Sequence, residues 1–166
     1  MLWNESVPTR AFRNVLTPVS SGNKIIVASH SEGMICVSGS GKSGKAILQW
    51  KNPKLKINLS TPVIIGQHLY GFAEKDRFIC VDIKTGKLNW EERGFGTFYA
   101  STLTDGKKLL VLGQLGELVL ITTNPNKYEE IDRMQVCGKS WSFPGYSNGR
   151  LFVRDQKTLQ CVQLLK

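Results

Sequence analysis

Residues 59–90 read LSTPVIIGQHLYGFAEKDRFICVDIKTGKLNW, and residues 16–50 read LTPVSSGNKIIVASHSEGMICVSGSGKSGKAILQW. Both stretches run through the same series of apolar segments and turns, and both end on a tryptophan. A more divergent unit occupies residues 100–134, and a fourth starts at residue 141 and ends before its last element. One turn glycine recurs at spacings of 44, 40 and 43 residues, at Gly22, Gly66, Gly106 and Gly149. The chain is therefore built from four units of about 42 residues.

Each unit predicts four short strands. In the second unit, polar turns separate runs rich in Val, Ile, Leu, Phe and Tyr at residues 61–65, 68–73, 77–82 and 87–92. No helix of ordinary length fits between these turns. The two middle strands are apolar on both faces, so both faces must be covered. Four-stranded antiparallel sheets that cover one another predict an all-β protein, a β-propeller with about four blades.

The boundaries of the units predict one propeller domain over residues 1–166. Its blades are expected at residues 16–52, 59–93, 100–135 and 141–166. The last blade lacks a fourth strand, and residues 1–4 are expected to complete it because Leu2 and Trp3 resemble the end of a fourth strand. Such closure leaves no open sheet edge. Four blades are also half of an eight-bladed ring, so missing blades of a seven- or eight-bladed ring and a homodimer stay open as alternatives.

One turn carries the signature of a family. Residues 80–90, CVDIKTGKLNW, resemble the tryptophan-docking pattern A-x-D-x-x-T-G-x-x-x-W of the pyrroloquinoline quinone (PQQ) propeller repeat family. The positions that match are Asp82, Thr85, Gly86 and Trp90, and Cys80 stands where alanine is usual. Asp and Thr side chains satisfy turn amides, glycine takes a positive φ, and tryptophan offers a flat plate to the next sheet. The pattern therefore has a structural role.

The resemblance implies two kinds of function. Some members of the family are quinoprotein dehydrogenases, in which PQQ and a calcium ion sit on the propeller axis with an aspartate base. Others are scaffolds without a cofactor, such as the propeller lipoprotein of the outer-membrane protein assembly machine. A scaffold implies a protein partner, which the sequence does not identify. The resemblance also implies a periplasmic or extracellular location, although residues 1–10 do not read as a secretory signal.

The residues that a dehydrogenase of this family needs are not found. Quinoprotein alcohol dehydrogenases carry two adjacent cysteines, whereas the four cysteines here are never adjacent. A calcium site needs several convergent oxygen ligands, but adjacent acidic residues occur only at 91–92 and 129–130. The sequence therefore predicts a non-enzymatic scaffold with no catalytic, cofactor-binding or metal-binding residues and no cofactor. PQQ and calcium belong only to the alternative that the chain is part of a quinoprotein dehydrogenase.

The cysteines read as core residues. Cys36, Cys80 and Cys161 occupy the same place on the third strand of their units, which predicts three buried free thiols. Sheets pack roughly 10 Å apart, too far for a disulfide between equivalent positions. Cys137 falls outside this register and has no assigned role.

Two further features resemble catalytic motifs and are better explained as turns. Residues 38–45, SGSGKSGK, have the spacing of a phosphate loop, but Ala46 follows where the loop needs a hydroxyl group, and no helix follows. We interpret them as an enlarged turn between the third and fourth strands. His30 and His68 stand at turn edges, and neither has a catalytic partner in the sequence.

The chain carries 22 Lys and Arg residues against 13 Asp and Glu residues, a net charge of +9. Solubility is the simplest explanation, and an anion-binding basic propeller is the second alternative function. Specific nucleic-acid binding is not expected, because the aromatic residues stand mainly inside strand patterns rather than alternating with basic residues on the surface. No apolar run approaches the roughly 20 residues that span a bilayer. A partner is expected at the propeller axis, which the first-strand ends near Thr17, Thr61, Ser101 and Ser142 should face.

Overall fold

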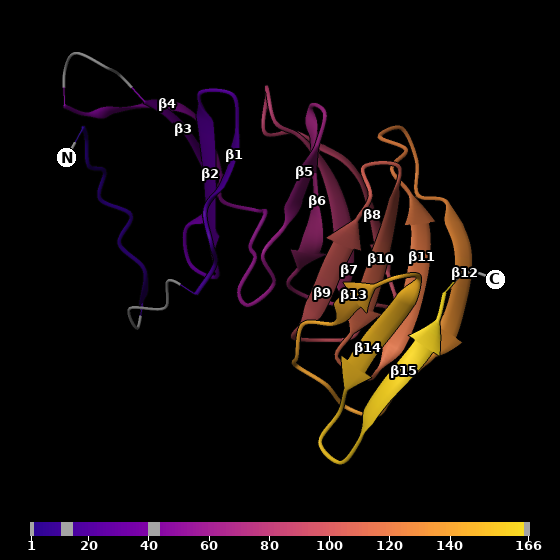
Figure 1. Ribbon diagram of the computed structural model, residues 1–166. Coiled ribbons are helices and arrows are strands. Elements are labelled where there is room, and N and C mark those ends of the chain that lie inside the picture. The colour runs from indigo at the N-terminus through magenta and orange to yellow at the C-terminus, as the bar shows by residue number, and fades with distance from the viewer. Residues whose placement is uncertain (1, 11–14, 40–43, 165–166) are drawn as a thin grey trace.

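The computed structural model describes residues 2–10, 15–39 and 44–164, and it confirms the all-β prediction. The strands form four antiparallel sheets, numbered 1 to 4 in chain order. Figure 1 shows these sheets following one another along the chain, from indigo to yellow. Within the described ranges, no helix is long and apolar enough to span a membrane.

Each sheet is a meander in which consecutive strands pair. Sheet 1 contains β1 (Val19–Ser21), β2 (Lys24–Ser29), β3 (Gly33–Gly39) and β4 (Ala46–Asn52). Sheet 2 contains β5 (Val63–Ile65), β6 (His68–Ala73), β7 (Arg77–Asp82) and β8 (Leu88–Arg93). Sheet 3 contains β9 (Ala100–Thr104), β10 (Lys108–Gly113), β11 (Glu117–Thr122) and β12 (Glu130–Gln135). Sheet 4 contains β13 (Gly145–Ser147), β14 (Arg150–Arg154) and β15 (Leu159–Gln163).

The strands end where the sequence places turn-forming residues. Gly66 connects β5 to β6 with a φ of 59°, a conformation that glycine adopts without strain. Sheet 3 uses Asp105 between β9 and β10, where its Oδ1 accepts hydrogen bonds from the backbone N–H groups of Lys107 and Lys108 at 2.8 and 2.7 Å. Both turns reverse the chain within a few residues, so neighbouring strands pair along their length.

Buried side chains fill the three interfaces between consecutive sheets. The interface between sheets 1 and 2 includes Ile26, Met34, Cys36, Leu69, Ile79 and Val81. The interface between sheets 2 and 3 includes Tyr70, Phe78, Cys80, Leu109, Val111 and Ile121. The interface between sheets 3 and 4 includes Leu112, Leu118, Leu151 and Val153. Sheets 2 and 3 therefore bury both faces, as the apolar character of both faces of their middle strands predicts.

The series of sheets is open between its two ends. Among the described residues, no cluster of buried hydrophobic side chains joins sheet 4 to sheet 1. Figure 1 shows sheet 4 in front of sheet 3, while sheet 1 lies at the left of the molecule with the N-terminal segment outside it. The four sheets thus form an arc in which each sheet covers the next.

Residues 2–4 lie beside sheet 1 in this structure and do not pair with sheet 4. Asn4 forms a parallel bridge with Lys45, just before β4. A Cβ atom added to Gly39 would come within 3.0 Å of the Trp3 Nε1 atom, so the indole lies against the end of β3. The segment expected to complete sheet 4 therefore lies at the opposite end of the arc, and sheet 4 has three strands.

One cysteine departs from the prediction. Cys36 and Cys80 are fully buried, whereas Cys161 is exposed. The prediction for Cys161 is wrong because it assumes that a further sheet covers sheet 4. Cys137 is buried in the connection between β12 and β13, a position that the repeat pattern does not identify.

Candidate functional site

The family signature forms a hydrogen-bonded turn between β7 and β8. The Asp82 Oδ1 atom accepts hydrogen bonds from the backbone N–H groups of Lys84 and Thr85 at 2.9 and 2.8 Å, and from the Thr85 hydroxyl group at 2.9 Å. Burial raises the pKa of Asp82, but the hydrogen bonds from Thr85 and Lys84 outweigh it, and the pKa lies below its ordinary value. The carboxylate therefore stays ionised and fixes the turn.

Trp50 joins sheet 1 to sheet 2, and Trp90 joins sheet 2 to sheet 3. The Trp50 indole N–H donates to the Ile83 carbonyl oxygen in sheet 2 at 3.0 Å, and the Trp90 indole N–H donates to the Asn124 carbonyl oxygen in sheet 3 at 2.9 Å. A Cβ atom on Gly86 would lie 2.5 Å from the Trp50 Cε3 atom. The glycine of the signature thus receives the tryptophan of the preceding sheet, and the signature acts in assembly of the arc.

The four first-strand residues expected at the axis meet in pairs. The Thr17 backbone N–H donates to the Thr61 hydroxyl oxygen at 3.4 Å, which links sheets 1 and 2. The Ser101 hydroxyl group donates to the Ser142 carbonyl oxygen at 3.4 Å, which links sheets 3 and 4. The Ala100 backbone N–H donates to the Ser60 hydroxyl oxygen at 3.0 Å between sheets 2 and 3. These polar groups bond to one another and hold the inner edges of the sheets together.

The described residues contain no group of three or more His, Cys, Asp or Glu side chains that could hold a metal ion. Burial raises the pKa of the Cys80 thiol to about 11 and raises the pKa of the Cys36 thiol above its usual range. Burial also raises the pKa of Cys137, and the nearby charge of Asp155 raises it further. These three thiols are protonated at neutral pH, whereas a cysteine nucleophile reacts as the thiolate.

The remaining sequence motifs lie at turns. His30 directly follows β2, and His68 is the first residue of β6. β3 ends at Gly39 and β4 begins at Ala46, so the first two residues of the 38–45 motif belong to β3 and the rest lie between the third and fourth strands of sheet 1. Residues 40–43 of this motif lie outside the described residues.

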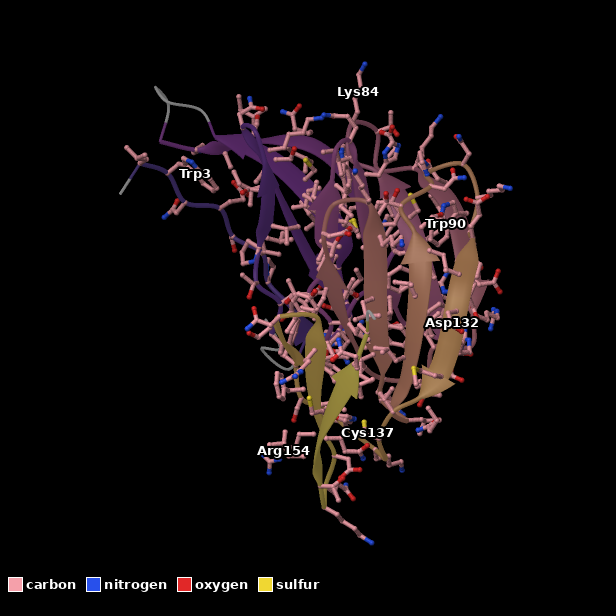
Figure 2. The ribbon with its side chains drawn as sticks, turned by 45° about the vertical axis from the view of Figure 1, so that its right-hand side comes forward. Trp3, Lys84, Trp90, Asp132, Cys137 and Arg154 are labelled. Atoms are coloured by element: carbon pink, nitrogen blue, oxygen red, sulfur yellow. The ribbon has the colours of Figure 1, made fainter. Side chains whose placement is uncertain are left out.

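Three exposed apolar side chains stand on the connections that link the sheets and on the turn after β10. The Phe98, Leu115 and Trp141 side chains are 62%, 53% and 63% exposed. The Trp141 ring lies 6.3 Å from the ring of the buried Tyr99, centroid to centroid. We call Phe98, Tyr99, Leu115 and Trp141 the aromatic surface. Ser140 directly precedes Trp141, and its hydroxyl group donates a hydrogen bond to the Arg154 carbonyl oxygen. Figure 2 shows Arg154 and Cys137 at the end of the molecule opposite Lys84.

Gln114 organises the aromatic surface. Its Oε1 atom accepts a hydrogen bond from the Phe98 backbone N–H at 3.0 Å, and its side-chain amide donates to the Thr97 hydroxyl oxygen at 3.0 Å. Its backbone N–H donates to the Tyr99 carbonyl oxygen at 2.9 Å, and its carbonyl oxygen accepts from the Ser140 N–H at 2.9 Å. The side chain is buried. One residue therefore fixes both connections that carry the exposed rings.

A second anchor holds the start of the same connection. The Arg133 guanidinium donates to the Gly94 carbonyl oxygen at 2.9 Å and lies over the Phe95 ring, 5.3 Å from its centroid. It also forms ion pairs with Glu117 and Glu130 at 2.5 and 2.8 Å. These carboxylates raise the pKa of Arg133, with Glu130 the largest cause. The guanidinium thus stays charged and holds the connection in place.

A hollow of about 200 Å³ opens beside Phe98. Its lining mixes apolar, charged and polar side chains: Asn58, Phe72, Glu74, Lys75, Thr97 and Phe98. The sequence reasoning missed this region because it placed the aromatic residues in strands. The signal that could have found it is the position of the stretch GTFY, which lies between the second and third predicted blades.

Comparison with known proteins identifies the family. The family described as outer membrane protein assembly factor BamB matches residues 1–92. No curated protein matches the chain. BamB from Moraxella catarrhalis superimposes with a TM-score of 0.71 at 14% identity, over 90% of this chain and 46% of the BamB chain.

Two other solved structures share the fold. The computationally designed Ika8 protein matches with a TM-score of 0.63 at 9% identity, over 89% of this chain and 45% of its own. AztD from Citrobacter koseri matches with a TM-score of 0.55 at 14% identity, over 91% of this chain and 44% of its own. The chain thus spans about half the length of these structures. The family match covers more than half of the chain, which therefore belongs to the BamB-type family of PQQ-repeat β-propellers.

Proposed function

We propose that the protein is a non-catalytic scaffold that binds another protein through the aromatic surface. The observation that carries this proposal is the exposure of Phe98, Leu115 and Trp141 on connections that Gln114 fixes from beneath. The description of the family as an assembly factor supports a role in bringing proteins together.

The aromatic surface has the physical character of a binding site. Exposed apolar groups gain free energy when a partner removes them from water, by about 25 cal/mol per Å². Tryptophan is enriched among the residues that dominate binding energy. Because hydrogen bonds to Gln114 already order both connections, association costs little conformational entropy there. The partner suited to this surface is a protein with an exposed apolar segment.

The character of the cysteines also supports a scaffold. The thiols of Cys36 and Cys80 fill interfaces between sheets, and burial keeps them in the unreactive protonated form. The polar side chains at the inner edges bond to neighbouring sheets. These groups serve the assembly of the arc.

Site-specific photo-cross-linking in cells that express the chain tests the proposal. Benzoylphenylalanine placed at Phe98 is expected to give a discrete adduct with one protein, and Trp141→Ala in the same chain is expected to remove it. The matched control places the same reagent at the exposed Lys84, at the opposite end of the molecule. No adduct from Phe98, or the same adduct from Lys84, would contradict the proposal.

A second measurement separates the scaffold from the enzyme. The purified chain is incubated with PQQ and calcium, and reduction of an electron-accepting dye is followed with alcohol and sugar substrates. A scaffold gives no reduction above the rate without protein. Robust turnover would favour the quinoprotein alternative and overturn the proposal.

A further inference from the structure

The outer face of sheet 4 has the residue pattern of an interface between sheets. Phe152 in β14 lies opposite Cys161 in β15, just as Tyr70 lies opposite Cys80 in sheet 2 and Ile26 lies opposite Cys36 in sheet 1. The pairs in sheets 1 and 2 are buried against the next sheet. On sheet 4, Phe152 is 38% exposed, Cys161 is exposed, and the neighbouring Leu159 is 74% exposed.

The outer face of sheet 1 is the complementary end. Val27 lies opposite Ile35, and Ile25 lies opposite Val37. The equivalent residues of sheet 2, such as Leu69 opposite Val81, pack against the preceding sheet. On sheet 1 this face instead borders a hollow of about 200 Å³ beneath the N-terminal segment, lined in part by Val7, Ile35, Val37 and Leu48. Sheet 1 thus presents the surface on which a preceding sheet would pack.

The N-terminal segment lies where the fourth strand of a preceding sheet belongs. Trp50 in β4 reaches forward to Gly86 of sheet 2, and Trp3 lies in a similar way against Gly39 of sheet 1. Leu2 is 88% exposed. Sheet 4 has three strands. Among the described strands, β15 pairs with β14 alone and therefore forms an edge of the sheet. The segment and the sheet that lacks a strand are at opposite ends of the same arc.

We propose that two copies of the chain associate head to tail. The outer face of sheet 4 in one copy packs on the outer face of sheet 1 in the other, and residues 2–4 of that other copy add a fourth strand beside β15. Both end faces of each copy are then covered, and the two equal contacts close into a ring of eight sheets instead of growing into a filament. The proposal does not depend on the aromatic surface.

Two observations favour a second copy as the occupant. Residues at the same strand positions form the three interfaces inside the arc and the two end faces. The proposed contact between copies therefore repeats the packing of one sheet on the next that is found inside the arc. The chain covers 46% of the BamB chain and 45% of Ika8, so two copies have nearly the length of one of those chains. Burial of Phe152, Cys161 and Leu159 provides the hydrophobic driving force.

The register of the added strand follows from the other sheets. Trp50 lies opposite Cys36 and Trp90 lies opposite Cys80. Trp3 of one copy is therefore expected opposite Cys161 of the other. Directly opposed residues on paired strands stand about 5 Å apart at their Cα atoms, which is within the range of a disulfide.

Sedimentation equilibrium of the full chain is the first test. The expected mass is twice the chain mass of 18.5 kDa, and Phe152→Asp is expected to shift it to the monomer by placing a charge in the contact. Ile131→Asp is the matched control, because it introduces the same charge at an exposed apolar residue of β12, outside the end faces and the aromatic surface, and it should leave the dimer intact. Circular dichroism confirms that each variant is folded. A monomer at all concentrations, or masses that keep growing beyond the dimer, would overturn the proposal.

Disulfide trapping gives a second test that does not depend on Phe152. Trp3→Cys under mild oxidation is expected to cross-link to Cys161 and to give a covalent dimer on a non-reducing gel. Cys161→Ser in the same chain should abolish the dimer. Asn4→Cys is the register control and should cross-link far less, because successive side chains on a strand point to opposite faces. A cross-linked monomer, which would show closure within one chain, or no product at all, would contradict the proposal.

Discussion

Trp50 and Gly86 show how a single pair of residues joins two sheets. The indole ring lies on the glycine of the following turn, where the positive φ of 70° and the absence of a side chain both matter. The indole N–H then reaches the Ile83 carbonyl oxygen of the same turn. Trp90 repeats this bond to Asn124 of sheet 3, whereas Asp132, opposite Leu120, stands at the equivalent place in sheet 3 and has no side-chain N–H to donate.

Gly86→Ala is expected to destabilise the protein more than a glycine replacement elsewhere. The new Cβ atom would meet the Trp50 ring at 2.5 Å, and overpacking of this kind costs about 1–3 kcal/mol, in addition to about 1 kcal/mol for the left-handed backbone. Gly66→Ala is the control, because Gly66 has a φ of 59° and no atom within 4 Å of the added Cβ. Urea denaturation measures both variants. Equal losses of stability would show that the Trp50 contact is unimportant.

Asp155 is expected to make stability depend on pH. Its Oδ2 atom accepts a hydrogen bond from the Gly138 N–H at 2.8 Å, and its Oδ1 atom accepts from the N–H groups of Lys157 and Thr158 at 2.8 and 2.7 Å. These bonds, with Gly138 the largest cause, hold the pKa of Asp155 well below its usual range. A depressed pKa in the folded state contributes stability above the unfolded value of about 3.9, and this stability is lost as the pH falls below it.

The test compares Asp155→Asn with the parent chain in urea at pH 7, 4 and 3. The variant should unfold at a lower urea concentration at pH 7, and the difference should shrink as the pH falls. Asp132→Asn, at an exposed position of β12, reports the effect of removing one surface carboxylate. A difference for Asp155→Asn that stays constant with pH would contradict the prediction.

At the scale of the elements, the connections between sheets are better ordered than their lack of regular structure would imply. Gln114, in the turn after β10, bonds to the connection that precedes β9 and to the connection that precedes β13. Arg133 in β12 holds the first of these connections at Gly94. Side chains from strands and turns thus replace secondary structure in fixing the aromatic surface.

Gln114→Ala is expected to loosen the aromatic surface and to lower stability. Loss of a buried amide leaves the Phe98 N–H without its acceptor, at a cost of about 1–3 kcal/mol. Hydrogen exchange at the Phe98 amide should accelerate, because its hydrogen bond to Gln114 is removed. Gln67→Ala, at an exposed position of the turn between β5 and β6, is the matched control. Unchanged exchange at Phe98 would argue that other contacts hold the connection.

At the scale of the whole molecule, stability should be highest in the middle of the arc. Sheets 2 and 3 pack on both faces and sheet 4 packs on one, and the stability of a repeat protein is approximately a sum of units and their interfaces. At concentrations where the chain is monomeric, the amides of β6, β7, β10 and β11 should exchange slowest, and those of β14 at least about tenfold faster, a difference of about 1.4 kcal/mol. Uniform protection would contradict this picture. Protection of β14 that rises with protein concentration would fit the head-to-tail contact.

The prediction of Cys161 shows the limit of reasoning from one repeat unit. Its place on the third strand is the same as that of Cys80, and the unit pattern therefore predicts burial. Whether the side chain is buried depends on the sheet packed against it: sheet 3 covers Cys80, whereas no sheet among the described residues covers Cys161. The same limit applies to residues 2–4, whose fourth-strand character is visible in the sequence although their neighbour is not.

The amino-acid sequence alone determined the strands, their order and the docking turn at Asp82, because hydrophobic period and turn chemistry are local properties. It also determined that the middle strands of sheets 2 and 3 need cover on both faces. Only the tertiary structure decided that the arc is open, that Gly86 receives the tryptophan of the preceding sheet, and that Gln114 links the connections that carry Phe98 and Trp141. These features depend on contacts between residues about 15 to 45 positions apart, which no local pattern encodes.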